Sequence, residues 1–332
     1  MKRLWLILPV ISLVLAQIPL PKPFAGSQTI NHLGYTLSYN ETHEQVNRVT
    51  YDNESIHITT GRVQTDRLTT IGTQSVLSVS WQEQFVQLPS RKNINQPILL
   101  LEPKLPIASV ILFPGGTGKV GLKPDGTLRH GGNFLVRSRH LFADHHLRVA
   151  VFEVPSHKNN GNGLLSGYRA SKEHAKDIET VVDYLKQRGN EPVWLIGTSR
   201  GSPSAANGAA RLTNKVNGLV LTSSLSVPNN KGTQIFELPL NNITAPTFIA
   251  SHRADLCHVT PPSDASYIKK KLKNAVATKV VLFDGGDEAR GRDCGPWGPH
   301  GFLGIENCVS DSVAICFFLN ENTFKIKVRR KG

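Results

Sequence analysis

From residue 84 onward, apolar runs of strand length alternate with segments of helical periodicity. Ala108–Phe113 and Pro192–Ile196 are apolar runs typical of buried parallel strands. Between them, Ser171–Gln187 places Ile178 and Val182 on one face, which predicts an amphipathic helix. Strands separated by helices form right-handed crossovers, so the pattern predicts an α/β domain with a mostly parallel central sheet and helices on both faces.

The remaining elements follow from the same patterns. Two strands joined by a turn are expected at 85–88 and 97–101, before the parallel part of the sheet. Further strands are expected at 148–152, 216–221, 247–250 and 279–283, and further helices at 133–146, 204–212 and 311–319. Residues 27–82 are polar and rich in Thr and Ser, with alternation at 55–59. We therefore predict a short, possibly β-rich extension over 17–83 and a catalytic domain over 84–332.

The N-terminus has the pattern of a secretory signal peptide. Lys2 and Arg3 precede an apolar run from Leu4 to Ala16, which ends in small residues suited to cleavage. An uncleaved anchor is the alternative, but the run is shorter than the roughly 20 residues that span a bilayer. We predict a signal peptide over 1–16 and a mature chain that begins near Gln17, is secreted or periplasmic, and has no stable membrane insertion.

Composition narrows the class of protein further. The chain has 332 residues, 39% of them hydrophobic and 19% charged, with 28 Gly and 20 Pro. These values fit a folded globular protein and exclude an acidic disordered chain, a collagen and a coiled coil. Lys and Arg exceed Asp and Glu by 38 to 25, a formal charge of +13. Because no basic cluster alternates with aromatic residues, we expect no nucleic-acid partner.

One motif predicts nucleophilic chemistry. Gly197-Thr198-Ser199-Arg200-Gly201 follows a predicted strand and precedes a helix rich in Ala, which is the setting of a G-x-S-x-G nucleophile elbow. The glycines leave room for a tight turn that lifts the hydroxyl of Ser199 above the sheet. The alternative is an ordinary glycine-rich turn between strand and helix.

With this motif in its setting, the sequence resembles the α/β-hydrolase superfamily over about residues 84–320. The resemblance implies a triad in the chain order nucleophile, acid, histidine. Asp255 follows the predicted strand at 247–250 and is the expected acid. Its rivals, farther along the chain, are Asp264, Asp284 and Asp287.

The resemblance also implies the base and the oxyanion hole. His300 follows the last predicted strand and a glycine-rich loop, where the superfamily places its histidine. The backbone N–H groups expected to bind the oxyanion are those of Gly116, or alternatively Gly115, and of Arg200. Pro114 stands where many esterases have His. A phosphate-binding Walker loop is excluded because Lys119 is followed by Val120.

These residues together predict the cleavage of a small-molecule carboxylic ester through an acyl-enzyme, with no cofactor. A serine peptidase or an acyltransferase would use the same triad, and a catalytically silent binding protein would use the same scaffold. His140, His145 and His146 share a predicted helix, but no acid or Cys spacing accompanies them, so we expect no metal.

Four cysteines, Cys257, Cys294, Cys308 and Cys316, are relevant to disulfides in an exported chain. Cys308 and Cys316 are too far apart for one bridge if both lie on a helix. Cys257 and Cys294 lie close in sequence to Asp255 and His300, which the implied triad brings together. We therefore expect a Cys257–Cys294 bond, and the rival pairing joins Cys294 to Cys308.

Overall fold

The computed structural model describes residues 81–318, with side chains to 314, and five strands nearer the N-terminus. The chain divides into two compact units, Met1–Ser80 and Trp81–Gly332. In the first unit, β1 (Ser27–His32) pairs with β2 (Tyr35–Asn40), and a three-stranded antiparallel sheet contains β3 (Gln45–Tyr51), β4 (Ile56–Gln64) and β5 (Arg67–Thr70). The predicted signal peptide at 1–16 lies outside the described residues.

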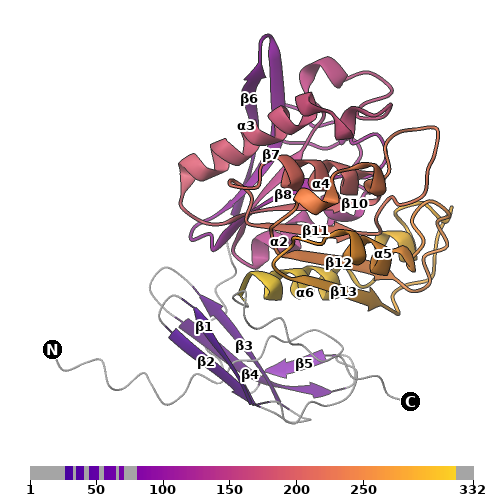
Figure 1. Ribbon diagram of the computed structural model, residues 1–332. Helices are drawn as coiled ribbons and strands as arrows, with labels where there is room; N and C mark the ends of the chain where they lie inside the picture. Colours follow the sequence, from indigo (N-terminus) through magenta and orange to yellow (C-terminus); the bar gives the residue numbers. More distant parts are fainter. Residues whose placement is uncertain are drawn as a thin grey trace. The chain divides into compact units, whose positions relative to one another are not determined.

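The second unit is built on one sheet of eight strands in the order β13-β12-β11-β10-β8-β9-β7-β6 (Figure 1). Neighbours from β9 to β13 run parallel, whereas β6, β7 and β9 pair antiparallel. The strands are β6 (Trp81–Arg91), β7 (Ile94–Pro103), β8 (Ala108–Phe113), β9 (Leu147–Phe152), β10 (Val193–Thr198), β11 (Gly218–Thr222), β12 (Thr247–His252) and β13 (Thr278–Phe283).

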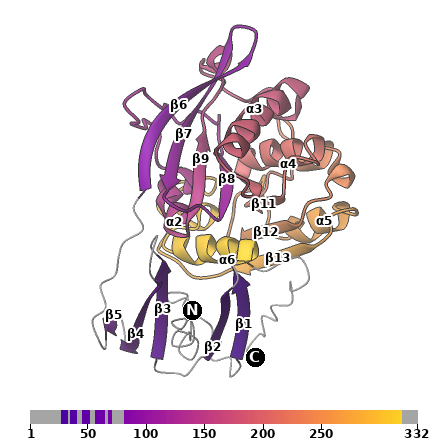
Figure 2. The ribbon, with the colours of Figure 1, turned by 90° about the vertical axis from the view of Figure 1, so that its left-hand side faces the viewer.

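Helices cover both faces of this sheet, as Figure 2 shows. One core cluster packs the sheet against α3, α4 and α5, and a second packs the opposite face against α1, α2 and α6. The helices are α1 (Phe134–Arg137), α2 (Arg139–Asp144), α3 (Lys172–Arg188), α4 (Ser202–Arg211), α5 (Asp264–Lys271) and α6 (Glu306–Phe318). The predicted three-layer α/β architecture is therefore confirmed.

Two helices differ from the prediction. The single helix expected at 133–146 is broken into α1 and α2 at Ser138, whose hydroxyl donates to the carbonyl of Phe134 at 2.6 Å. Such a bond from a side chain to the backbone one turn earlier is a common cause of helix bending. Helix α5 was not predicted, because only Ala265 and Ile268 of its eight residues are buried and the apolar stripe is short.

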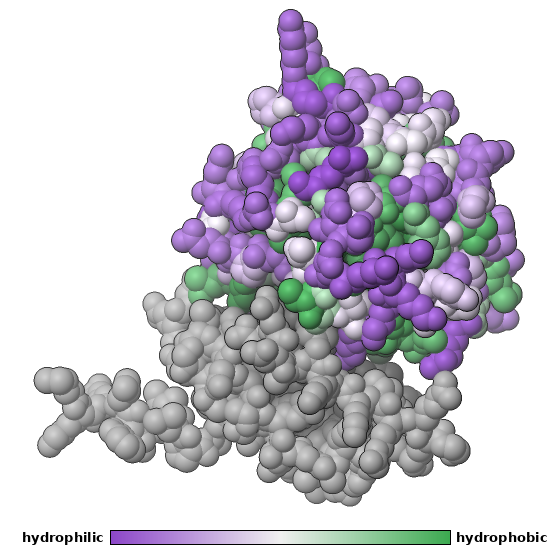
Figure 3. All heavy atoms as spheres, in the orientation of Figure 1, coloured by the Kyte–Doolittle hydropathy of each residue, from purple (hydrophilic) through white to green (hydrophobic). Residues whose placement is uncertain are grey.

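The described surface is mainly hydrophilic. On the face in Figure 3, hydrophilic residues cover much of the described surface and apolar residues form smaller groups between them. The exposed large apolar side chains of the described residues are Leu105, Leu256, Tyr267, Val276 and Trp297. No helix in the described part of the chain is both long and apolar enough to cross a membrane.

Candidate active site

The turn after β10 has the geometry of a nucleophile elbow. Ser199 has a φ of 52°, in the left-handed region that non-glycine residues rarely adopt. A Cβ on Gly197 would collide with the carbonyl of Gly201, and a Cβ on Gly201 would collide with the carbonyl of Phe113. Both glycines are therefore required by close backbone approach, which explains why the motif has this spacing.

The loop after β8 lies against this elbow. A Cβ on Gly115 would lie 3.2 Å from the Cβ of Ser199. Gly116 has a φ of 58°, and the N–H of Gly118 closes the turn by donating to the carbonyl of Gly115 at 3.0 Å. Among the described residues, the N–H groups of Gly116 and Arg200 have no acceptor. Unpaired N–H groups in the loop that packs on the elbow and directly after the serine are what an oxyanion hole needs.

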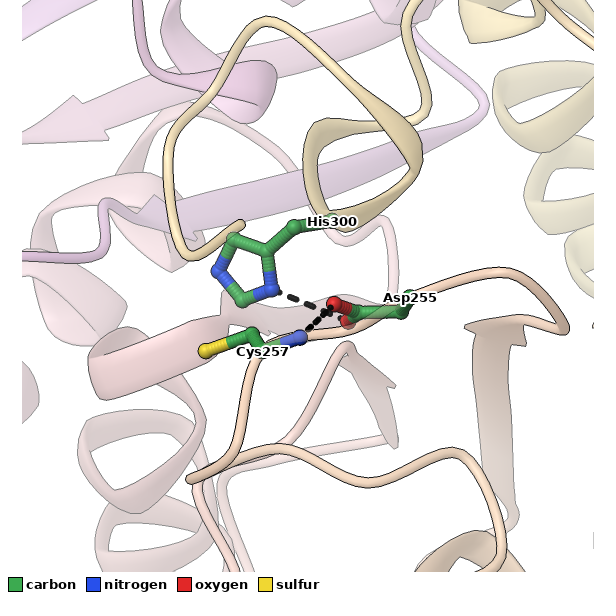
Figure 4. Close-up of side chains that lie close together, drawn as sticks. All are labelled: Asp255, Cys257 and His300. Carbon is green, nitrogen blue, oxygen red and sulfur yellow. Dashed lines mark hydrogen bonds and ion pairs between the residues drawn. The ribbon is translucent and has the colours of Figure 1, made fainter. Parts of the chain in front are cut away.

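Asp255 and His300 meet at the carboxyl ends of β12 and β13. His300 lies in the short 3₁₀ helix η6 (Pro299–Gly301), and its Nδ1 lies 2.9 Å from Oδ2 of Asp255. The other carboxylate oxygen accepts the N–H of Cys257 at 2.9 Å (Figure 4). Both residues are buried, at 5% exposure each. The bond to Nδ1 leaves the second ring nitrogen directed away from Asp255, as a general base requires.

Ser199 and His300 are linked through the segment that follows β11. Ser223 donates its hydroxyl to the carbonyl of His300 at 3.0 Å, and the N–H of Leu225 donates to the carbonyl of Ser199 at 3.4 Å. Within residues 81–314, no hydrogen bond joins the side chains of Ser199 and His300. In serine hydrolases without bound substrate, the hydrogen bond between the serine and the histidine is often long, and it shortens only when substrate binds.

Comparison with solved structures identifies the fold. The chain is similar to a dienelactone hydrolase from Anabaena variabilis, with a TM-score of 0.50, 14% identity, and coverage of 71% of this chain and 97% of that one. It is similar to an esterase from Pyrococcus furiosus, with a TM-score of 0.50, 13% identity, and coverage of 74% and 94%. This chain has the α/β-hydrolase fold. No protein-family model matches the sequence, and no curated protein matches it.

On this α/β-hydrolase fold, Thr260 is a site residue that the sequence analysis missed. Its hydroxyl lies 3.2 Å from Oδ2 of Asp255 and 3.2 Å from Nδ1 of His300. The hydroxyl can donate to the carboxylate and so fix the oxygen that faces the imidazole. The available signal was its place five residues after Asp255, between Val259 and Pro261, but nothing in that pattern points to the contact.

A disulfide joins Cys257 to Cys294, with 4.6 Å between the Cα atoms. This is the predicted pairing. Because Cys294 is bonded to Cys257, the rival bond from Cys294 to Cys308 is not formed, and Cys308 is a half-buried free thiol on α6. Burial raises the pKa of that thiol. The side chain of Cys316 lies outside the described residues.

Asp255, Cys257 and His300 also bring together three potential metal-ligand atoms. Donor atoms of Asp255, Cys257 and His300 lie within 4.8 Å of one another. The sulfur of Cys257 is bonded to Cys294, so it is not the thiolate that a metal would take. The carboxylate and Nδ1 are already bonded to each other, and the group does not fit a metal ion.

Arg200, directly after Ser199, brings a charge to the site. Its Nη1 donates to Oδ1 of Asn229 at 2.7 Å. Burial lowers the pKa of this guanidinium. A neutral amide therefore holds the cation that lies next to the candidate nucleophile in sequence.

Proposed function

We propose that this chain is an exported serine hydrolase that cleaves carboxylic esters of small molecules through an acyl-enzyme. The observation that carries the proposal is the buried 2.9 Å bond between Asp255 and His300, at the same end of the sheet as the strained turn of Ser199. Serine, imidazole and carboxylate are the groups that such hydrolysis requires. The solved structures named above include an esterase and a dienelactone hydrolase.

The proposed steps assign one role to each residue. His300 takes the proton of Ser199 as the hydroxyl oxygen attacks the ester carbonyl, and Asp255 stabilises the imidazolium that forms. The N–H groups of Gly116 and Arg200 hold the oxyanion of the tetrahedral intermediate. The alkoxide leaves with the proton from His300, and a water molecule activated by His300 then releases the acid. Gly115 is the alternative donor, since it lies against Ser199.

A fluorophosphonate probe tests the nucleophile. Wild-type protein is expected to be labelled at Ser199, and Ser199→Ala is expected to lose labelling and ester turnover while keeping its unfolding midpoint. Ser266→Ala, an exposed serine on α5, is the matched control and should behave as wild type. Normal turnover by Ser199→Ala would remove the proposal. Labelled protein that turns over peptides, or transfers acyl groups to alcohols in preference to water, would replace the esterase with a peptidase or an acyltransferase.

Export is the second part of the proposal. It is supported by the apolar run that ends at Ala16 and by the disulfide between Cys257 and Cys294, because such bonds persist in oxidising compartments. N-terminal sequencing of the mature protein should begin near Gln17. Protein recovered from the cytosol with Met1 in place would contradict export.

A further inference from the structure

Arg169 is a buried cation without a carboxylate partner. It lies in the 3₁₀ helix η2 (Tyr168–Ala170) and is only 4% exposed. Its three hydrogen bonds go to neutral oxygens, and its Nε has no partner. In the part of the chain with described side chains, no acid forms an ion pair with it. Burial, and secondarily the charge of Arg200, lower the pKa of Arg169 to about 9.

The three acceptors belong to the two segments that would form the oxyanion hole. Nη2 donates to the carbonyl of Pro114 at 3.1 Å and to the carbonyl of Gly116 at 3.2 Å. Nη1 donates to the hydroxyl of Ser204 at 2.7 Å, on the helix that follows the elbow. The side chain of Arg169 therefore bonds both to the loop that carries the N–H of Gly116 and to the helix that follows the N–H of Arg200.

These bonds fix the direction of the donor peptide. The N–H of Gly116 belongs to the peptide that joins Gly115 to Gly116, and the carbonyl of that peptide accepts the N–H of Gly118. Arg169 holds the carbonyls on either side of it. Because each peptide is planar and trans, holding three successive carbonyls also determines where the intervening N–H points. The loop is tight: a Cβ on Gly118 would lie 2.8 Å from Nη2 of Arg169.

A buried guanidinium of purely structural use normally has acidic partners. Arg148, 3% exposed, bonds to carboxylates of Glu102 and Glu191. Burial of an uncompensated cation is costly. Arg169 is buried without such a partner beside the loop where negative charge would develop during ester cleavage. A positive charge at that place favours the oxyanion.

We propose that Arg169 is a positioning residue of the oxyanion hole, which aligns the N–H of Gly116 with that of Arg200 and adds positive potential behind them. The inference rests on the proposed serine hydrolase function. Arg169 does not touch substrate; it acts through the backbone of the loop after β8 and through Ser204.

The test separates transition-state stabilisation from stability. Arg169→Met is expected to lower kcat about 10- to 100-fold with little change in KM, somewhat less than the 10²–10³-fold typical of a lost oxyanion donor. Its affinity for an aryl trifluoromethyl ketone, which forms a tetrahedral oxyanion adduct, should fall by the same factor. Its affinity for the neutral alcohol product should be unchanged. Arg169→Lys should recover part of kcat, since it restores the charge but not the second nitrogen.

Arg148→Met is the matched control. It removes an equally buried arginine and should lower the unfolding midpoint while kcat and ketone affinity stay near wild type. Ser204→Ala, which removes only the contact to α4, should fold normally and lower kcat about 3- to 10-fold; it carries the test if Arg169→Met does not fold.

Two different failures are distinguishable. An active wild type whose Arg169→Met and Ser204→Ala variants keep kcat and ketone affinity within twofold would overturn the role of Arg169 alone. A drop in kcat without a matching drop in ketone affinity would do the same. A folded wild type that neither turns over esters nor reacts with the fluorophosphonate would overturn the proposed function and this role with it.

Discussion

The two halves of the candidate site are held by different forces. The oxyanion half is defined as residues 113–122, the elbow at 197–204, and the two buried charged side chains that bind them, Arg169 and Glu153. In this half, backbone packs directly on backbone, and the two side chains bind loop amides and carbonyls. In the acid–base half, defined as residues 255–260 with 294–300, the chain arrives through an exposed segment at 284–293. A disulfide joins the two segments of that half.

Glu153 is the second buried charge of the oxyanion half. Its carboxylate, 5% exposed, accepts the N–H groups of Val120 at 3.1 Å, Leu122 at 2.7 Å and Val154 at 2.7 Å. It fixes the chain just beyond the segment that Arg169 holds. The oxyanion half is therefore held by buried side chains alone, whereas the acid–base half, which is reached through an exposed segment, has a disulfide in addition to the buried carboxylate of Asp255.

The largest expected effect comes from breaking the acid–base pair. Asp255→Asn should lower kcat about 10³–10⁴-fold, because an amide can donate to Nδ1 and would then favour the wrong imidazole tautomer. The free energy of unfolding should change little, since the Cys257 N–H still has an acceptor. Steady-state kinetics on a chromogenic ester measures the change.

Asp284→Asn is the control for that variant. Asp284 is an exposed rival acid that pairs with Arg253 at 2.7 Å. Loss of activity in Asp284→Asn, with Asp255→Asn active, would transfer the role of the acid to the other loop.

The next effect is on stability and concerns the disulfide. Replacing Cys257 and Cys294 together by Ser should lower the free energy of unfolding by about 3–4 kcal/mol, the chain-entropy value for a separation of 37 residues. Urea unfolding measures it. Cys308→Ser, which alters a half-buried free thiol, should cost less than half as much. Equal losses in the two variants would mean that the bond does not constrain the chain.

Glu153→Gln tests the buried carboxylate of the oxyanion half. One oxygen becomes an NH₂ group, so either the N–H of Leu122 or the pair from Val120 and Val154 loses its acceptor. An unsatisfied buried donor costs about 1–3 kcal/mol. Glu83→Gln, at a partly exposed pair with Arg139, should cost at most about 1 kcal/mol. Urea unfolding of the two variants side by side decides whether burial makes this difference.

The effect that is smallest at neutral pH is a pH dependence of stability, caused by a histidine that packs against Phe113 beside the oxyanion half. His174 is fully buried against Phe113, Phe152 and Tyr168, and neither ring nitrogen has a hydrogen-bond partner. Burial, with the charges of Arg169 and Arg91, holds the pKa of His174 well below its ordinary value. Below about pH 6.5, His174 therefore binds a proton in the unfolded chain but stays neutral in the folded chain.

The contribution of neutral His174 to the free energy of unfolding is fully present above the pKa of His174 in the unfolded chain. It is lost as the pH falls, with a slope of at most about 1.4 kcal/mol per pH unit for one proton. His174→Phe should reduce that slope between about pH 4.5 and 6.5, measured by urea unfolding at several pH values. An unchanged slope would show that His174 titrates alike in both states.

The fold was largely predictable because its signals are local. Ala108–Phe113 is a strand of the same bounds in sequence and structure, since a buried parallel strand is apolar along its length. The break at Ser138 and helix α5 were not predictable, because a single side-chain bond and two buried residues leave little trace in the pattern.

For the candidate site, the predictable part is the part with a fixed local geometry. The elbow was visible because Gly197 and Gly201 meet backbone, and Asp255 and His300 were implied by the superfamily resemblance. Arg169, Glu153 and Thr260 escaped notice because each acts on a segment distant in sequence or through a hydroxyl with no motif of its own. Their roles depend on tertiary contacts that no periodicity encodes.

The strand order has a consequence for loop length. Three strand intervals separate β13, which leads to His300, from β10, which leads to Ser199. At about 4.8 Å per interval, the chain must carry the imidazole back roughly 14 Å across the end of the sheet to reach the serine. The segment from 284 to 299 spans this distance, so its length determines whether His300 can reach Ser199 in the proposed site. Shortening it would withdraw the base from the nucleophile while every strand kept its neighbours.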